Sequence, residues 1–188
     1  MNFTTKERRV TFLSFFPRSC YSLQLLVYLW KRAQILVAET WAAFYPLNPK
    51  DPHPLFPGPQ GPEIWRLTMF ADYRVPQILH HLFILSYPPS LLRKLHSHTP
   101  LTSGSREEVS LRAASIVAVE RVREEILLLI KEEGGESEKA LDAGFVSSVL
   151  IDFYLWDLAK KLESGEAKIE GIATAQMVPI HRTRSIWY

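Results

Sequence analysis

Two apolar segments that each contain aspartate constrain the fold of this chain more than any other feature. They are residues 67–77 (LTMFADYRVPQ) and residues 149–158 (VLIDFYLWDL). Taken as a helix, the second segment is apolar on nearly every side, so we expect it to be buried. Burying an ionised carboxylate without a partner costs roughly several kcal/mol. A plain hydrophobic core would therefore not retain both Asp152 and Asp157.

The spacing within residues 149–158 places both acids beside aromatic rings. At about 100° per residue, these side chains fall within roughly 140° of arc: Asp152, Trp156, Phe153 and Asp157. Such a face is suited to the wall of a pocket for a flat, polar, cationic ligand. The structural alternatives are that the aspartates pair with arginines, that Trp156 belongs to the core, and that Asp72 only caps the next helix.

The composition is that of one ordinary domain. The chain has 188 residues, 47% of them hydrophobic, which is enough for a sizeable core. Its formal net charge of +2 is too small for a general nucleic-acid binder, and its single cysteine, Cys20, excludes an intrachain disulfide. The single cysteine indicates a reducing compartment, so we expect a cytoplasmic protein. The nucleus and the mitochondrion are alternatives, because residues 1–29 are rich in Arg and Ser like a targeting segment. The apolar runs in that stretch are too short to cross a bilayer, so no membrane is expected as a partner.

The hydrophobic periodicity predicts a helical protein. We expect helices at residues 31–44, 76–85, 90–98, 106–133 and 146–163. Pro76 is placed to open the second helix at its first turn, and Ser105 followed by Glu108 predicts a capping box for the fourth. Residues 45–63 contain seven of the thirteen prolines and should form an extended surface loop inside one domain. Because no alternating strand series occurs, the predicted fold class is all-α.

Several stretches of the chain resemble the queuosine salvage proteins, which are queuosine 5′-phosphate N-glycosylase/hydrolases. They are KRAQIL at residues 31–36, LTMFADYRVPQ at 67–77, REEV at 106–109 with RAAS at 112–115, DFYLWD at 152–157 and HRTRSIWY at 181–188. They follow the order of the family and extend over most of residues 30–188. The set is specific, whereas any one stretch alone is a weak signal.

The resemblance implies an all-helical fold similar to that of DNA glycosylases. It also implies an enzyme that hydrolyses queuosine 5′-phosphate, releasing queuine and leaving ribose 5-phosphate. By motif position, it assigns the catalytic carboxylate to Asp152 and the substrate contacts to Phe70, Asp72, Phe153 and Asp157. The implied partner is this small-molecule substrate, with no nucleic acid and no cofactor.

The N-terminus departs from the family pattern. Family members have a long N-terminal half before the segment that corresponds to residues 31–36, and that half supplies a histidine to the pocket. Residues 1–29 do not resemble it. We therefore expect an atypical leader over residues 1–29, followed by a queuosine-salvage-like helical domain over residues 30–188 with weak activity or none.

The chemistry of such a reaction matches these residue types. Cleavage of an N-glycosidic bond builds positive charge on the ribose, which a carboxylate can stabilise or attack. Queuine is a 7-deazaguanine and has no N7 to protonate, so an aspartate on its guanine edge would help the base to leave. Queuosine also carries a cationic secondary amine, a natural partner for a third carboxylate. Which of Asp72 and Asp157 takes which role does not follow from the sequence.

The remaining polar residues give weaker signals. The 5′-phosphate requires cations, and the candidates are Lys31, Arg32, Arg74, Arg182 and Arg184. No metal site is expected, because His80 and His81 would point apart on a helix and no His-Glu-x-x-His motif occurs.

Two other function classes compete with the hydrolase. One is an inactive truncated fragment that acts at most as a binding or interaction module. The other is a nucleic-acid binder that uses residues 181–184, which the near-neutral charge disfavours.

Overall fold

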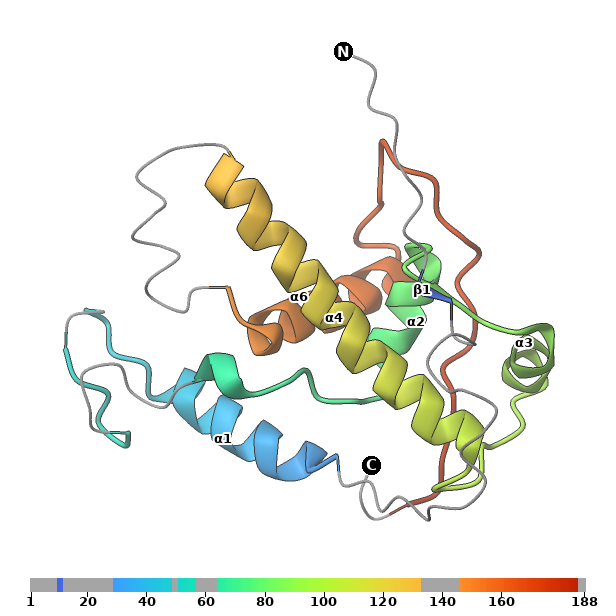
Figure 1. Ribbon diagram of the computed structural model, residues 1–188, viewed down its shortest axis with the longest axis horizontal. Helices are drawn as coiled ribbons and strands as arrows, with labels where there is room; N and C mark the ends of the chain where they lie inside the picture. Colours follow the sequence, from blue (N-terminus) through green and yellow to red (C-terminus); the bar gives the residue numbers. More distant parts are fainter. Residues whose placement is uncertain (1–9, 12–28, 49–50, 57–63, 133–145, 186–188) are drawn as a thin grey trace.

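The longest helix, α4, organises the fold, and the other helices lie around it (Figure 1). The structure is a computed structural model and describes residues 10–11, 29–48, 51–56, 64–132 and 146–185. Its helices are α1 (Lys31–Ala43), α2 (Arg74–His81), α3 (Pro89–His96), α4 (Arg106–Glu132) and α6 (Ser148–Ser164), with a short 3-10 helix, η1 (Ile64–Arg66). The predicted all-α class is confirmed.

Extended pairing in the described residues is confined to a few positions. Strand β1 (Val10–Thr11) runs parallel to β2 (Leu85–Ser86), with Val10 opposite Leu85. A further bridge joins Leu101 to Thr183. These contacts tie down chain segments without forming a layer of their own. Apart from residues 10, 11 and 29, the predicted leader lies outside the described residues.

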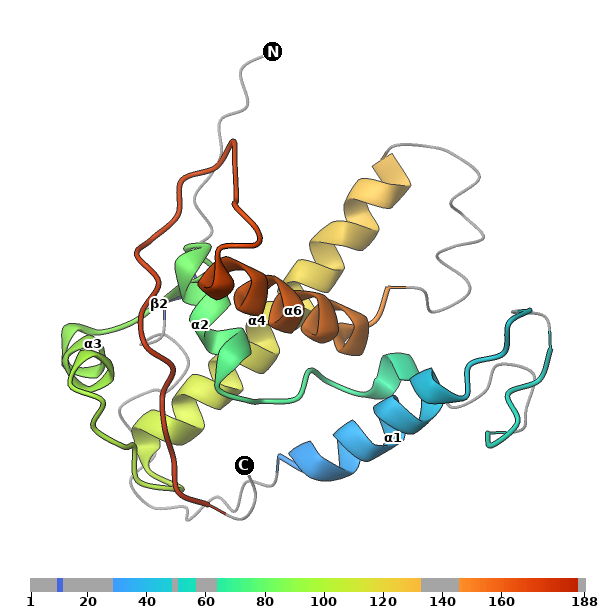
Figure 2. The same ribbon diagram turned by 180° about the vertical axis from the view of Figure 1, so that it is seen from behind.

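Helices α2 and α6 pack against each other and against α4, and both views show them on the same side of α4 (Figures 1 and 2). The main core fills this junction. Its fully buried side chains include Ile78, Leu79, Leu85, Leu91, Leu111, Val119 and Met69. A second, smaller cluster of Ala38, Ile64, Phe70 and Val149 joins α1 and η1 to α6. Helix α1 therefore docks through the residues just before α2.

The start of α2 corrects the sequence-based boundaries. The helix begins at Arg74 rather than at Pro76, because Asp72 Oδ1 accepts the amide hydrogens of Arg74 at 2.9 Å and Val75 at 3.0 Å. Pro76 still stands in the first turn, where a missing N–H costs no intrahelical bond. The helix ends at His81, four residues early, because the chain turns through Phe83 with a φ of 58°.

The predicted capping of α4 is confirmed with one change. Ser105 Oγ accepts the Glu108 amide hydrogen at 3.3 Å, as in a capping box. The Glu108 carboxylate reaches one residue further back and accepts from the Gly104 amide at 3.1 Å. Helix α6 begins after Ser147, whose Oγ accepts from the Leu150 amide, and it ends at Gly165 with a φ of 78°. A positive φ favours glycine at this position.

Helix α6 is not buried on every side, contrary to the prediction. Tyr154 is 66% exposed and Trp156 is 36% exposed, so Trp156 does not belong to the core. The Trp156 ring is flanked by two cations, with Lys160 Nζ 4.6 Å and Arg74 Cζ 5.9 Å from its centroid. An amphipathic aromatic ring next to cations is stable at the surface, which an apolar residue count does not reveal.

Part of the proline-rich loop is anchored to α1. His53 is 6% exposed, and its Nδ1 accepts the amide hydrogens of Leu55 and Phe56 at 3.2 Å. Its Nε2 therefore carries the proton and donates to the Trp41 carbonyl at 3.0 Å. The predicted absence of helix holds for residues 45–48 and 51–56, and residues 49–50 and 57–63 lie outside the described residues.

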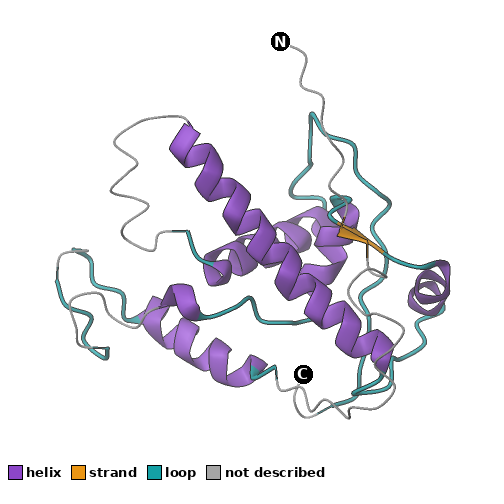
Figure 3. Ribbon diagram, viewed as in Figure 1, coloured by secondary structure: helices purple, strands orange, loops and turns teal. Residues whose placement is uncertain are grey.

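The segment after α6 returns across the molecule as an extended chain (Figure 3). Its Ala175 amide donates to the His81 carbonyl, Gln77 Nε2 donates to the Val178 carbonyl, and the Leu101 amide donates to the Arg182 carbonyl. These bonds carry the chain from the end of α2 to the start of α4. In the part of the chain that the structure describes, no helix is long and apolar enough to cross a membrane.

The packing makes a direct stability prediction. Leu79→Ala should destabilise the fold by about 2–5 kcal/mol, because Leu79 is fully buried in the main core. Leu36→Ala is the matched control, since Leu36 lies in α1 and is 68% exposed, and it should change stability by less than about 0.5 kcal/mol. Urea unfolding followed by circular dichroism measures both. Equal losses would show that the core assignment is wrong.

Candidate functional site

Residues 70–72, between η1 and α2, touch three helices through consecutive residues. The Phe70 amide donates to Asp152 Oδ2 on α6 at 2.5 Å. The Ala71 carbonyl accepts from Arg112 Nε on α4 at 2.8 Å. Asp72 caps the start of α2, as described above. The two predicted acid-bearing segments are thus joined directly, at Phe70 and Asp152.

Asp72 and Asp152 form a buried acid pair. They are 7% and 3% exposed. Burial, and secondly the charge of Asp72, raise the pKa of Asp152 to about 8, although the Phe70 amide and Lys31 act in the opposite direction. Burial also raises the pKa of Asp72, against the lowering effect of the Val75 amide and Lys31. Near neutral pH, therefore, Asp152 retains its proton.

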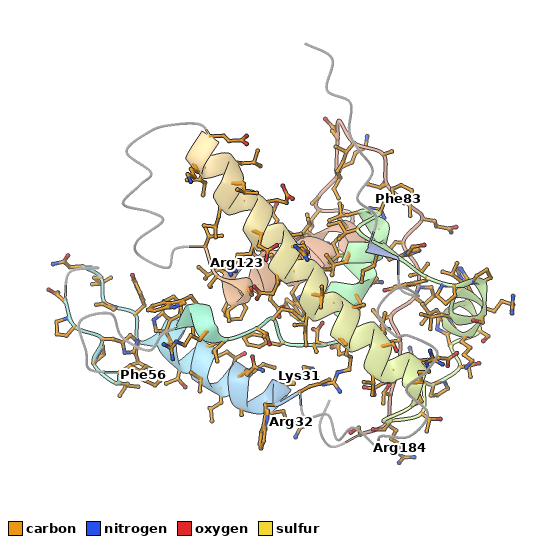
Figure 4. The ribbon with its side chains drawn as sticks, in the orientation of Figure 1. Lys31, Arg32, Phe56, Phe83, Arg123 and Arg184 are labelled. Carbon is orange, nitrogen blue, oxygen red and sulfur yellow. The ribbon has the colours of Figure 1, made fainter. Side chains whose placement is uncertain are left out.

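Lys31 supplies a positive charge next to this acid pair. It is the first residue of α1, and its Nζ lies 5.7 Å from the centroid of the Tyr73 ring. Burial lowers the pKa of Lys31, while Asp72 and Asp152 raise it. Figure 4 shows Lys31 and Arg32 at the same end of α1. The site therefore combines two carboxyl groups, Asp72 and Asp152, with one ammonium group, Lys31, whose charges act on each other.

Two polar residues of the site were not singled out by sequence reasoning. Arg112 and His181 are 7% and 4% exposed. Burial, and secondly the charges of Arg112 and Lys31, lower the pKa of His181 to about 4, so its ring is neutral at pH 7. The spacing of Glu108 and Arg112, four residues apart on a helix, could have indicated a paired arginine. His181, on the extended C-terminal segment, was marked only as the first residue of the family-like stretch 181–188 and of the alternative nucleic-acid segment 181–184.

Two aromatic side chains flank Asp152. The rings of Phe70 and Phe153 lie 5.7 Å apart between centroids at an interplanar angle of 63°, an edge-to-face contact. Phe70 is 5% exposed and packs in the smaller core cluster, whereas Phe153 is half-buried at its border. The structure therefore brings together four of the predicted residues: Phe70, Asp72, Asp152 and Phe153.

Asp157 lies apart from this group. Its side chain is 55% exposed and forms an ion pair with Lys161 at 2.6 Å, one turn along α6. The expectation that both aspartates of this helix are buried is wrong for Asp157. The predicted shared face of α6 divides at the surface, because Phe153 and Asp152 turn inward while Trp156 and Asp157 turn outward.

The candidate phosphate ligands are in different surroundings. Arg74 binds Glu163 at 2.5 Å, while Arg32, Arg182 and Arg184 are exposed. In Figure 4, Arg184 lies below and to the right of Lys31, on the C-terminal segment. The charges of both acids of the pair act on Lys31.

The chain can now be compared with known proteins. The model of the queuosine salvage protein family matches residues 9–188. The chain belongs to this family. The match begins within the predicted leader, and the boundary between residues 29 and 30 stays a prediction.

Curated relatives agree with the family match, and they are named queuosine 5′-phosphate N-glycosylase/hydrolase. The chain is 38% identical to the Bos taurus protein and 40% identical to the Mus musculus protein, in each case over 159 residues. It is 37% identical to the Schizosaccharomyces pombe protein over 171 residues. These matches include 85%, 85% and 91% of this chain, and the chain spans about 40% of the length of each relative.

This arrangement can perform acid–base and electrostatic chemistry. Because the charge of Asp72 raises the pKa of Asp152, the two carboxyl groups lose their protons at different pH values. The Phe70 amide occupies Oδ2 of Asp152, so Oδ1 is the oxygen that can face a ligand. A developing positive charge next to such a pair is stabilised more strongly than in water.

The pair makes a titration prediction. In Asp72→Asn, the pKa of Asp152 should fall below about 8, because the neighbouring negative charge that raises it is removed. Carboxyl carbon NMR of the wild-type chain and the variant measures this pKa. Asp51→Asn is the control, since Asp51 is exposed and accepts a bond from Asn48. An unchanged Asp152 titration in Asp72→Asn would disprove the coupling.

Proposed function

We propose that this chain hydrolyses the N-glycosidic bond of queuosine 5′-phosphate and releases queuine for salvage into tRNA modification. The observation that carries the proposal is the buried acid pair of Asp72 and Asp152 in a member of the queuosine salvage family. The names of the relatives support the same reaction. The substrate is a small molecule, and no nucleic-acid partner is part of the proposal.

Asp152 is the proposed catalytic carboxylate. As the bond between base and ribose breaks, positive charge develops at the anomeric carbon, C1′. An ionised carboxylate next to C1′ stabilises this charge or forms a transient bond with it, and water then completes the hydrolysis. The Phe70 amide fixes one carboxylate oxygen through its bond to Oδ2 and leaves the other for the ribose.

The substrate itself promotes ionisation of Asp152. Queuosine carries a secondary amine that is positively charged at neutral pH. With Asp72 as the residue that binds this amine, the positive charge lies next to the buried pair and favours release of the proton of Asp152. Binding and activation of the carboxylate are coupled in this proposal, because burial and the charge of Asp72 raise the pKa of Asp152 to about 8.

The remaining proposed contacts recognise the base and its side arm. Phe70 and Phe153 flank the flat ring, with the exposed part of Phe153 available for contact. Asp72 and Asp157 take the guanine edge and the cationic amine, in an order left open. Asp157 could serve the side arm, since it lies one helical turn from Phe153 on the outward face of α6.

The first test is replacement of the catalytic carboxylate. Asp152→Asn retains the shape of the side chain and its acceptor for the Phe70 amide, but it removes the charge. It should lower queuine release at least about a hundredfold, the usual contribution of a group that stabilises transition-state charge. Release of queuine from queuosine 5′-phosphate is followed by chromatography, with a full-length relative assayed beside the chain. Near-wild-type turnover would remove Asp152 from this role.

The second test concerns binding. Asp72→Asn and Asp157→Asn should each raise KM for queuosine 5′-phosphate by about tenfold, the value of one lost charge-assisted hydrogen bond. The effect on kcat should be smaller for Asp157→Asn than for Asp72→Asn, because the exposed side chain of Asp157 lies outside the acid pair. The exposed Asp51→Asn variant should leave both constants unchanged. An unaltered KM in either variant would exclude that residue from substrate binding.

A further inference from the structure

A buried ion pair on α4 reaches the site from behind. The Arg112 and Glu108 side chains are 8% and 3% exposed, and Arg112 Nη1 lies 3.0 Å from Glu108 Oε1. The free-energy cost of removing both charges from water can exceed the attraction between them, so we expect a buried pair to make a further specific contact. That contact is the bond from Arg112 Nε to the Ala71 carbonyl at 2.8 Å.

The orientation of the Ala71 carbonyl affects the position of Asp72. Its peptide group is planar, so the direction of this C=O also fixes the direction of the Asp72 amide and the start of the Asp72 backbone. One residue earlier, the Phe70 amide is bound to Asp152. The two bonds hold the peptide groups on either side of the Phe70–Ala71 peptide, one from α4 and one from α6.

Arg112 is held by Glu108, which is itself held by a backbone amide. Glu108 Oε1 accepts from its Nη1, while Glu108 Oε2 accepts from the Gly104 amide at the start of α4. The planar guanidinium can donate along Nε and Nη1 at once, whereas a lysine ammonium is a single flexible point. The geometry therefore uses a property that arginine alone has.

We propose that Arg112 is a positioning residue, which holds the peptide of Ala71 so that Asp72 and Asp152 face the same ligand. Its link to catalysis rests on the proposed hydrolysis. Arg112 acts on this segment through its hydrogen bond to the Ala71 carbonyl, while its charge is paired with Glu108 and also lowers the pKa of His181 and of Lys31.

The test compares two arginines of the same helix. Arg112→Lys keeps the charge and loses the forked geometry. Arg121→Lys is the matched control, because Arg121 pairs with Glu124 on the same helix but is 68% exposed. Hydrogen exchange of backbone amides is measured by NMR on the full chain, with the Leu79 amide as the reference for global opening.

The expected result is local. In Arg112→Lys, the Phe70 amide should exchange at least about tenfold faster than in Arg121→Lys. The reason is that loss of the bond to the Ala71 carbonyl loosens the short segment that also contains the Phe70 amide. The Leu79 amide should be unchanged. In the turnover assay, kcat should fall by about tenfold to a hundredfold, as misplaced catalytic groups do, with a smaller change in KM. Arg121→Lys should match the wild type.

Other outcomes are decisive in different ways. Equal acceleration of Phe70 and Leu79 would show that Arg112 supports only global stability, and unchanged Phe70 exchange would show that it does not hold the segment. Either result overturns the proposal. Selective acceleration of Phe70 in a chain that releases no queuine would support the positioning role and contradict the proposed function.

A second variant covers the case in which Arg112→Lys does not fold. Glu108→Gln keeps the side-chain shape and one oxygen acceptor for Arg112, and it removes the charge and the second acceptor, which binds the Gly104 amide. Phe70 should then exchange faster than in the wild type, with the Leu79 amide unchanged, because Arg112 is held less firmly. Wild-type exchange at Phe70 in this variant would contradict the proposal.

Discussion

The hydrogen bond from the Phe70 amide to Asp152 is the contact on which the rest of the site depends. It joins residues that are 82 positions apart and brings the segment before α2 onto α6. Three consequences follow from it. Asp72 comes close enough to raise the pKa of Asp152, Phe70 meets the ring of Phe153, and α1 gains the small cluster that docks it.

The raised pKa of Asp152 lowers the stability of the folded chain near neutral pH. The pKa of Asp152 is raised from 3.8 to about 8, so between these values the folded chain retains a proton that the unfolded chain releases. The stability present at low pH is therefore lost as the pH rises from about 4 through 8. A buried acid pair thus weakens the protein at the pH at which its charge is needed, and a ligand cation would compensate.

The helices and the acids could be predicted from the sequence, because both depend on local signals. The periodicity gave α1, α4 and α6 within one or two residues at each described end, and the apolar setting marked Asp152. The surface position of Asp157 and Trp156 was missed, although Lys161 and Lys160 follow them by four residues on α6 and are a local signal; the contact of Trp156 with Arg74 of α2 depends on the tertiary structure and could not be predicted. The part of Arg112 was hidden for a similar reason: its partner is a backbone carbonyl 41 positions away.

The most direct measurement is a crystal structure of Asp152→Asn with intact queuosine 5′-phosphate, which the slowed reaction should preserve. The account predicts that C1′ of the ribose lies within about 3.5 Å of the side chain at position 152, the distance of a group poised to act on it. The base should lie against Phe153, with Asp72 within hydrogen-bond distance of its edge or of its side arm. Substrate bound on another face, or with C1′ turned away from position 152, would contradict the central claim.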